Sequence, residues 1–264
     1  MSFSAYKYFG SEQIESFGER QIRISNQVNL KSTTWQSEIY QRWQFTSKSQ
    51  IKYFIGASDQ PATPASLSPA EEKISQGFFG AMSGKYPTLA DLPKNFKVAD
   101  NWPECPTVKE ISDQSQCGSA WAVSSANCMT DRICIHSQGI DNRKISAVDI
   151  MSCCSACGSG CDGGVSWIAF KQWVIRGYVT GAPYGDKNTC RPYPFPPCAH
   201  NIFSETLENC ANEVDSADST NKNYFDTPKC EHACIPSYSK NYWDDLVFGK
   251  AWYTFSGESN MMKE

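Results

Sequence analysis

The chain has 264 residues, of which 40% are hydrophobic and 13% are aromatic. This composition is sufficient for a hydrophobic core and excludes an intrinsically disordered chain. The formal net charge is −4, and the lysines and arginines are scattered along the chain. Nucleic-acid binding and attraction to an anionic membrane are therefore excluded. No apolar run reaches the roughly 18 residues of a membrane span, so the sequence predicts a soluble protein.

Thirteen cysteines stand at close and irregular spacings, which is typical of an oxidising compartment. Residues 1–20, however, lack the continuous apolar stretch of a secretory signal peptide. We favour the interpretation that a leader is missing from this version of the chain, and a cytosolic, reduced protein is the alternative.

Residues 1–56 are polar, contain aromatic islands and have no cysteine, so they form a separate block. Residues 57–91 carry four prolines among alanine, serine and glycine, which predicts a linker without regular structure. All thirteen cysteines follow this linker. The cysteine-rich domain is therefore expected to begin near Leu92.

Three helices are predicted within this domain. The first begins just after Ser119, a candidate N-cap, because apolar residues then recur at helical spacing. The second opens on a capping box formed by Ser146 and Asp149. The third spans about 167–174 and is terminated by Gly177.

The two stretches after these helices have different patterns. Residues 181–236 are rich in proline and cysteine and show no periodicity, so we expect loops held by disulfides. Residues 242–255 carry aromatics typical of strands.

The motif that carries chemistry is QSQCGSAW, at residues 114–121. It differs from the papain and cathepsin signature C-G-S-C-W only at the reactive position, where Ala120 replaces the nucleophilic cysteine. The first turn of a helix lies at the positive end of the helix dipole and favours a thiolate. The methyl side chain of Ala120 has no ionisable group, so the helix dipole cannot activate it.

The resemblance extends to the cathepsin B branch of the family. Residues 102–111 resemble the start of the mature enzyme, and the cysteine and glycine cluster at 153–164 resembles its central disulfide region. The proline-rich stretch at 190–198 and the run TPKC at 227–230 resemble the loop region of that branch. Residues 33–36, TTWQ, resemble the inhibitory pro-segment.

This resemblance implies an α+β papain-like fold with the helical half largely present and the β-rich half incomplete. It implies a pro-segment-like region at 1–56, a linker and maturation border at 57–91, and a C-terminally truncated peptidase domain at 92–264. The border motif LPxxF is followed by Lys-Val-Ala, beginning at Lys97, where the family has Asp-Ala-Arg. Normal proteolytic removal of the pro-segment is therefore not expected.

The resemblance also implies site roles. The oxyanion hole would use the Gln114 side chain and the backbone N–H of residue 120. The family's catalytic histidine and asparagine are not found: His136, His200 and His232 all lack the expected Gly-His-Ala setting. We expect substrate contacts from Gly118, Trp121, Gly163, Gly164 and His200, with Trp121 also packing in the core.

The cysteines are expected to be structural, and the resemblance implies their pairing. Cys128 is left over and is expected to be a buried small hydrophobe, not a displaced nucleophile. A zinc cluster at Cys153, Cys154, Cys157 and Cys161 is the less favoured alternative. The implied disulfides are Cys105–Cys134, Cys117–Cys161, Cys153–Cys230, Cys154–Cys157, Cys190–Cys234 and Cys198–Cys210.

The leading functional hypothesis is an inactive cathepsin B-like pseudopeptidase that holds peptides or its own pro-segment in its cleft. We expect a monomer in the lysosome or outside the cell, without a cofactor or metal. One alternative is an active lysosomal or secreted endopeptidase and peptidyl dipeptidase from which this chain derives by substitution or truncation. Another is a secreted disulfide scaffold that binds partners through residues 190–234.

Overall fold

The computed structural model describes residues 17–32, 34–39, 68–83, 90, 92–199, 204–208, 210, 225–255 and 257–263. The chain divides into two compact units, Met1–Ile51 and Lys52–Glu264. None of the helices in the described part of the chain is both long and apolar enough to span a membrane.

The first unit contains helix α1, Phe17–Lys31, and an extended segment at 34–39. The segment is fixed to the helix by polar side chains, because the Ser37 carbonyl accepts hydrogen bonds from Ser25 Oγ at 3.0 Å and Asn29 Nδ2 at 2.9 Å. The Ser37 N–H donates to Asn29 Oδ1 at 2.6 Å. Residues 34–36 of the TTWQ run, which the sequence predicts to be pro-segment-like, lie in this segment, and Thr33 lies outside the described residues.

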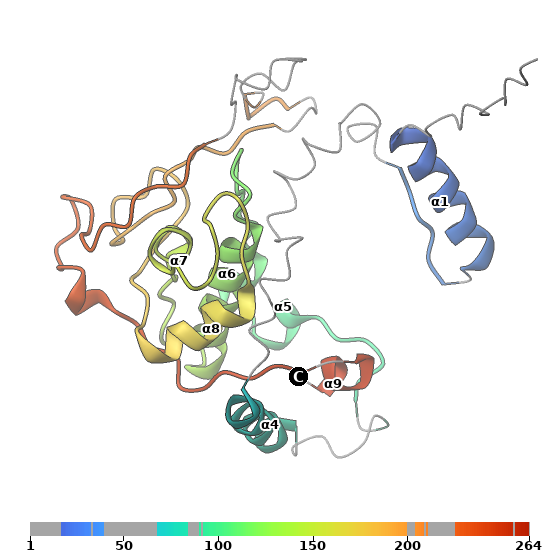
Figure 1. The fold of residues 1–264 in the computed structure, drawn as a ribbon, viewed down its shortest axis with the longest axis horizontal. Helices are drawn as coiled ribbons and strands as arrows, with labels where there is room; N and C mark the ends of the chain where they lie inside the picture. Colours follow the sequence, from blue (N-terminus) through green and yellow to red (C-terminus); the bar gives the residue numbers. More distant parts are fainter. Residues whose placement is uncertain are drawn as a thin grey trace, which may run out of the picture. The chain divides into compact units, whose positions relative to one another are not determined.

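The second unit is built around helix α6, Ala120–His136. Helices α7, Ala147–Cys153, and α8, Ser166–Ile175, pack against it (Figure 1). Its buried face includes Ala122, Ala126 and Met129, which recur at helical spacing as expected. The three predicted helices are therefore confirmed, and Gly177, at a φ of 72°, follows the end of α8 in the left-handed conformation.

The buried carboxylate of Asp149 connects α7 to segments distant in the sequence. Only half of the predicted capping box forms: Ser146 Oγ accepts from the Asp149 N–H at 3.1 Å, but the Asp149 side chain does not return the bond. Its carboxylate instead accepts from Arg191 Nη1 at 2.9 Å, Tyr242 Oη at 2.9 Å and the Val179 N–H at 3.3 Å. The side chain is fully buried, so these partners replace water.

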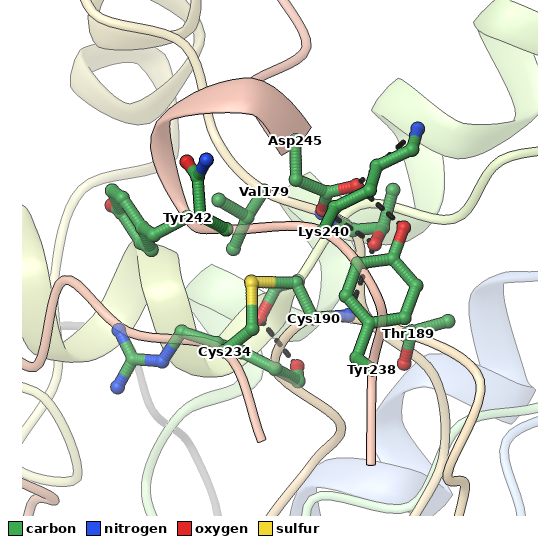
Figure 2. The surroundings of a disulfide bond; sticks show 12 residues. Val179, Thr189, Cys190, Cys234, Tyr238, Lys240, Tyr242 and Asp245 are labelled. Atoms are coloured by element: carbon green, nitrogen blue, oxygen red, sulfur yellow. Dashed lines mark hydrogen bonds and ion pairs between the residues drawn. A yellow bond between two sulfur atoms is a disulfide. The ribbon is translucent and has the colours of Figure 1, made fainter. Parts of the chain in front are cut away.

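A second buried carboxylate, that of Asp245, fixes the chain just after Tyr242 to the rest of the unit. Asp245 ends the 3₁₀ helix η3, Trp243–Asp245. It accepts hydrogen bonds from the Thr180 N–H at 2.7 Å and Tyr238 Oη at 2.6 Å. Figure 2 shows Asp245, Tyr238 and Lys240 grouped beside the Cys190–Cys234 disulfide.

The strand expectation for residues 242–255 is wrong. Within the described residues this stretch forms η3 and one isolated bridge, Tyr178 to Val247, and the described part of the chain has isolated bridges in place of a strand ladder. The Asp245 N–H bonds back to the Tyr242 carbonyl at 3.3 Å, which closes a turn where a strand would extend. The aromatic residues pack here without sheet pairing.

The expectation that residues 57–91 lack regular structure is wrong at 69–83, because helix α4 spans Pro69–Ser83, whereas residues 57–67, 84–89 and 91 lie outside the described residues. Its first turn is a capping box: the Ser68 N–H donates to Glu71 Oε2 at 2.8 Å, and the Glu71 N–H donates to Ser68 Oγ at 3.3 Å. Pro69 occupies the first helical position, where a proline is favourable. This proline marks the start of a helix and does not break one.

Helix α4 is docked on the rest of the second unit through Glu71, Ser75 and Phe79. Lys171 on α8 forms an ion pair with Glu71. The Thr254 N–H donates to Ser75 Oγ at 2.8 Å. Phe79 stacks on Phe255 with ring centroids 5.3 Å apart.

The structure contains the six disulfides that the resemblance implies. The four cysteines of the zinc alternative all belong to disulfides, which excludes that cluster. Cys128, the free cysteine of the described residues, is half-buried on α6 and not fully buried as expected, because it lies beside the buried stripe. The short helices α5, η2 and α9 span Val98–Asn101, Pro106–Lys109 and Glu258–Lys263.

Substituting Asp149→Asn should lower the free energy of unfolding by about 3–5 kcal/mol, because it leaves the Arg191 guanidinium buried without a counter-ion. Urea denaturation with the disulfides intact measures this loss. The matched control is Asp141→Asn, whose ion pair with Arg143 is largely exposed and should change stability by less than about 1 kcal/mol. Equal effects of the two substitutions would contradict the role given to Asp149.

The docking of α4 should depend on pH through Glu71. The hydrogen bond from Lys171, with those from Ser68, lowers the pKa of Glu71 from 4.5 to about 2. Because the pKa is lower in the folded state, this stabilisation is complete above about pH 4.5 and is lost as the pH falls through about 2. Hydrogen exchange of α4, corrected for intrinsic rates, should show this loss in the wild type and no such transition in Glu71→Gln. Glu72→Gln on the same helix should behave as the wild type.

Candidate active site

The candidate site lies at the N-terminal end of α6. Ala120 is the first residue of this 17-residue helix and is half-buried. The loop that enters the helix is fixed by the Cys117–Cys161 disulfide and by a bridge between Gly118 and Asp162. The position of Ala120 is therefore set by covalent and backbone contacts on the loop before it.

The first amide groups of α6 point out of the helix without helical acceptors. The Ser119 carbonyl accepts from the N–H groups of Ala122 and Val123 at 2.8 and 2.9 Å. Among the described residues, no acceptor is found for the N–H groups of Ala120 and Trp121. Together with the helix dipole, these groups suit a carbonyl oxygen or an anion.

Ser119 occupies the predicted N-cap position, but its side chain does not cap the helix. Its hydroxyl lies 2.7 Å from Tyr193 Oη, and Tyr193 Oη also donates to the Gln114 carbonyl at 2.8 Å. One phenol thus joins the segment that carries Gln114 to the end of α6. The oxyanion role of the Gln114 side chain stays a prediction.

Ser115, next to Gln114, has a φ of 55°, a left-handed conformation that is uncommon for a residue other than glycine. It is buried, and its N–H donates to Asp113 Oδ1 at 2.6 Å. Backbone strain of this kind concentrates at functional sites and persists only where neighbouring contacts hold it. The segment at 113–116 is therefore held in one particular shape beside Ala120.

Trp121 belongs to the core. Its side chain is 4% exposed, and Nε1 donates to the Gly160 carbonyl at 3.0 Å. A Cβ at position 164 would lie 2.4 Å from Cε2 of this indole, so packing requires Gly164. Gly163 has a φ of 104°. Packing and backbone conformation explain both glycines, and the substrate contacts of Gly118, Trp121, Gly163 and Gly164 stay predictions.

His136 lies far from Ala120, and His232 packs against aromatic side chains. His136 ends α6, about 24 Å from residue 120 along the helix axis. His232 packs on Trp243, with ring centroids 5.2 Å apart. His200, predicted to contact a substrate carboxylate, lies outside the described residues.

Within the described part of the chain, one group of histidine, cysteine or acidic side chains is close enough to hold a metal ion. It consists of Cys153, Cys230 and His232. Because the two cysteines are joined in a disulfide, they cannot act as thiolate ligands, and the group is not a metal site.

Two residues of this site were missed by the sequence interpretation, namely Ser115 and Tyr193. Their roles come from a backbone conformation and from contacts between distant segments, neither of which has a periodic signal. The only sequence signal for Tyr193 is its place in a loop bounded by cysteines, directly after Arg191 and Pro192.

Residues 92–241 match the family model described as papain family cysteine protease. The chain belongs to this family. It is 43% identical over 164 residues to "Cathepsin B-like cysteine proteinase 6" of Caenorhabditis elegans, covering 62% of this chain and 41% of that protein. It is 35% identical over 173 residues to "Cathepsin B-like cysteine proteinase" of Schistosoma japonicum, covering 66% and 47%.

A solved structure, "proCathepsin B S9 from Trypanosoma congolense", matches with a TM-score of 0.59 and 31% identity, covering 92% of this chain and 66% of that one. Within the papain family, the chain is thus cathepsin B-like and has the papain-like fold. The chain spans less than half the length of the two curated relatives described above.

The packing role of Gly164 can be tested by Gly164→Ala. The added methyl group would overlap the Trp121 indole, so the free energy of unfolding should fall by about 1–3 kcal/mol. Gly80→Ala is the control, because a Cβ there meets no atom within 4 Å and the position lies in α4. This control should be neutral or stabilising by up to about 1 kcal/mol in the same denaturation experiment.

Proposed function

We propose that this chain is a cathepsin B-like pseudopeptidase that binds peptides at the N-terminal end of α6 without cleaving them. The observation that carries the proposal is Ala120, which stands at the first position of α6 where the family motif has its nucleophile. A methyl group has neither a lone pair to attack a carbonyl carbon nor a proton to transfer. Acyl transfer through this position is therefore not available.

No other thiol in the described residues can replace the missing one. Cys117 is oxidised in its disulfide with Cys161. Cys128 is free, but it lies about 12 Å further along the axis of α6. A peptide held at the helix end would not reach it.

The groups that would recognise a peptide are still present. The open N–H groups of Ala120 and Trp121 offer donors to a peptide carbonyl or a C-terminal carboxylate, and the helix dipole favours negative charge there. The solved relative is described as a procathepsin, a form that includes its pro-segment. We include the chain's own pro-segment-like region among its ligands.

The disulfides support a place in the lysosome or outside the cell. Six disulfides are formed, and such bonds persist in oxidising compartments, whereas the cytosol keeps thiols reduced. We propose a monomer that acts there without a cofactor.

The purified chain should show no turnover of a fluorogenic peptide substrate above background, because loss of one member of a hydrolytic triad costs about 10⁶-fold. Ala120→Cys should also be inactive, since no described histidine lies beside position 120. Turnover by the unsubstituted chain that a thiol-directed inhibitor abolishes would overturn the proposal. Turnover by Ala120→Cys alone would show that a general base reaches the site.

Peptide binding can be measured by fluorescence anisotropy with a labelled peptide that has a free C-terminal carboxylate. Ala120→Phe should weaken binding more than about tenfold, because the ring covers the open N–H groups. Ala233→Phe is the matched control at an exposed position in the loop between Cys230 and Cys234. Loss of binding in Ala233→Phe alone would reject the helix-end site in favour of the disulfide-laced loop.

A further inference from the structure

The Cys153–Cys230 disulfide differs from the other disulfides in its exposure. Cys230 is exposed, whereas every other disulfide-bonded cysteine of the described residues is buried or half-buried. Its partner Cys153, at the end of α7, is only 8% exposed. One end of this bond is therefore open to solvent and the other lies in the core, so a thiol in solution can approach it from the Cys230 side.

The buried sulfur of this bond already has a charged donor. Arg191 Nη1 donates to Cys153 Sγ at 3.1 Å and to Asp149 Oδ1 at 2.9 Å, and its two protons allow both hydrogen bonds at once. Asp149 offsets part of the charge of the guanidinium but leaves the hydrogen bond to sulfur in place. A neighbouring arginine favours the thiolate form of a cysteine. Cys153 is therefore the sulfur that the surroundings can stabilise as an anion.

The exposed sulfur has a fixed polar neighbour. His232 Nε2 lies 3.6 Å from Cys230 Sγ, and the imidazole is held between the rings of Tyr242 and Trp243, at centroid distances of 5.0 and 5.2 Å. The surroundings of the two sulfurs thus differ in both exposure and charge.

This asymmetry gives thiol–disulfide exchange a direction. Such exchange occurs by attack of a thiolate on one sulfur and departure of the other, and exposed disulfides are the more labile ones. A thiolate R–S⁻, after losing its proton to solvent, would form a new bond to Cys230 Sγ. The bond to Cys153 Sγ would break, and its electron pair would leave on Cys153 as a thiolate beside Arg191.

Other contacts hold the chain near Cys230, so this bond can open without unfolding. Thr227 Oγ1 accepts from the Cys161 N–H at 2.8 Å and donates to the Ser159 carbonyl at 3.2 Å. On the other side, the Cys190–Cys234 disulfide ties the same segment to the core (Figure 2).

We propose that Cys230 is a thiolation site, at which a low-molecular-weight thiol opens the Cys153–Cys230 disulfide and forms a mixed disulfide with Cys230. The thiol is the only co-reactant, because one disulfide is exchanged for another. Attack by Cys153 on the mixed disulfide reverses the step and releases the thiol. The site is separate from peptide binding at α6 and does not rest on it.

The experiment treats the full folded chain with reduced glutathione, in a Cys128→Ala background that removes the free cysteine. The reaction is quenched with acid, and the chain is then unfolded and alkylated with N-ethylmaleimide under mildly acidic conditions, so that buried thiols are also labelled. Peptide mapping by mass spectrometry should find, as the first product, glutathione on Cys230 and maleimide on Cys153. This product should form at least about tenfold faster than that of any other disulfide.

Two double variants locate the reaction. Cys153→Ala with Cys230→Ala should give no adduct over the same period. Cys198→Ala with Cys210→Ala is the matched control, because it removes a disulfide whose more accessible cysteine is only half-buried. This control should keep the adduct on Cys230 at the parent rate.

The dependence on glutathione concentration separates direct attack from unfolding. The initial rate should rise in proportion to the concentration, because the exposed sulfur is attacked in the folded chain. A rate independent of the concentration would show that unfolding limits the reaction and would overturn the proposal. A first adduct on Cys153 or on a cysteine of another disulfide would overturn it too. Both readouts come from the parent chain, so they decide the question even if a double variant does not fold.

Discussion

The buried charge of Asp149 is the interaction on which the rest of the second unit depends. A carboxylate that is fully removed from water is tolerated only where charged and polar partners surround it, and here they come from Val179, Arg191 and Tyr242. These contacts fix α7, the loop after Cys190 and the segment before η3 relative to one another. Tyr193 follows Arg191 closely in the chain, so the same contacts place its phenol at the end of α6.

The local pattern of the sequence predicts the helices that contain their own start and stop signals. α6, α7 and α8 begin where serine caps or apolar periodicity indicate, and Gly177 follows α8 as expected. The sequence pattern does not predict helix α4, because Pro69 is one of four prolines that disfavour regular structure over 57–91, although Ser68 and Glu71 beside it have the spacing of a capping box. The strand expectation for 242–255 failed because strand-like residues need a partner strand, which local sequence does not reveal.

In the candidate site, too, some features could be predicted from the sequence and others could not. The motif around Ala120 identifies the position of the missing nucleophile, and the family resemblance implies all six disulfide pairs. The hydrogen bonds that shape the site could not be predicted, because Tyr193 lies 74 residues from Ser119 and 79 residues from Gln114. Contacts at that separation depend on the tertiary fold, and the serine pattern at 119 looks the same whether or not its hydroxyl is engaged elsewhere.

The docking of α4 has a consequence for any protease cut between this helix and Leu92. In the intact chain α4 is tethered, so its contacts with Lys171, Thr254 and Phe255 form at a high effective concentration. After a cut, the same contacts become a bimolecular association. Dilution alone would then release the helix, whereas a concentrated sample would retain it as a nicked complex. The amount of α4 bound would report protein concentration as well as cleavage.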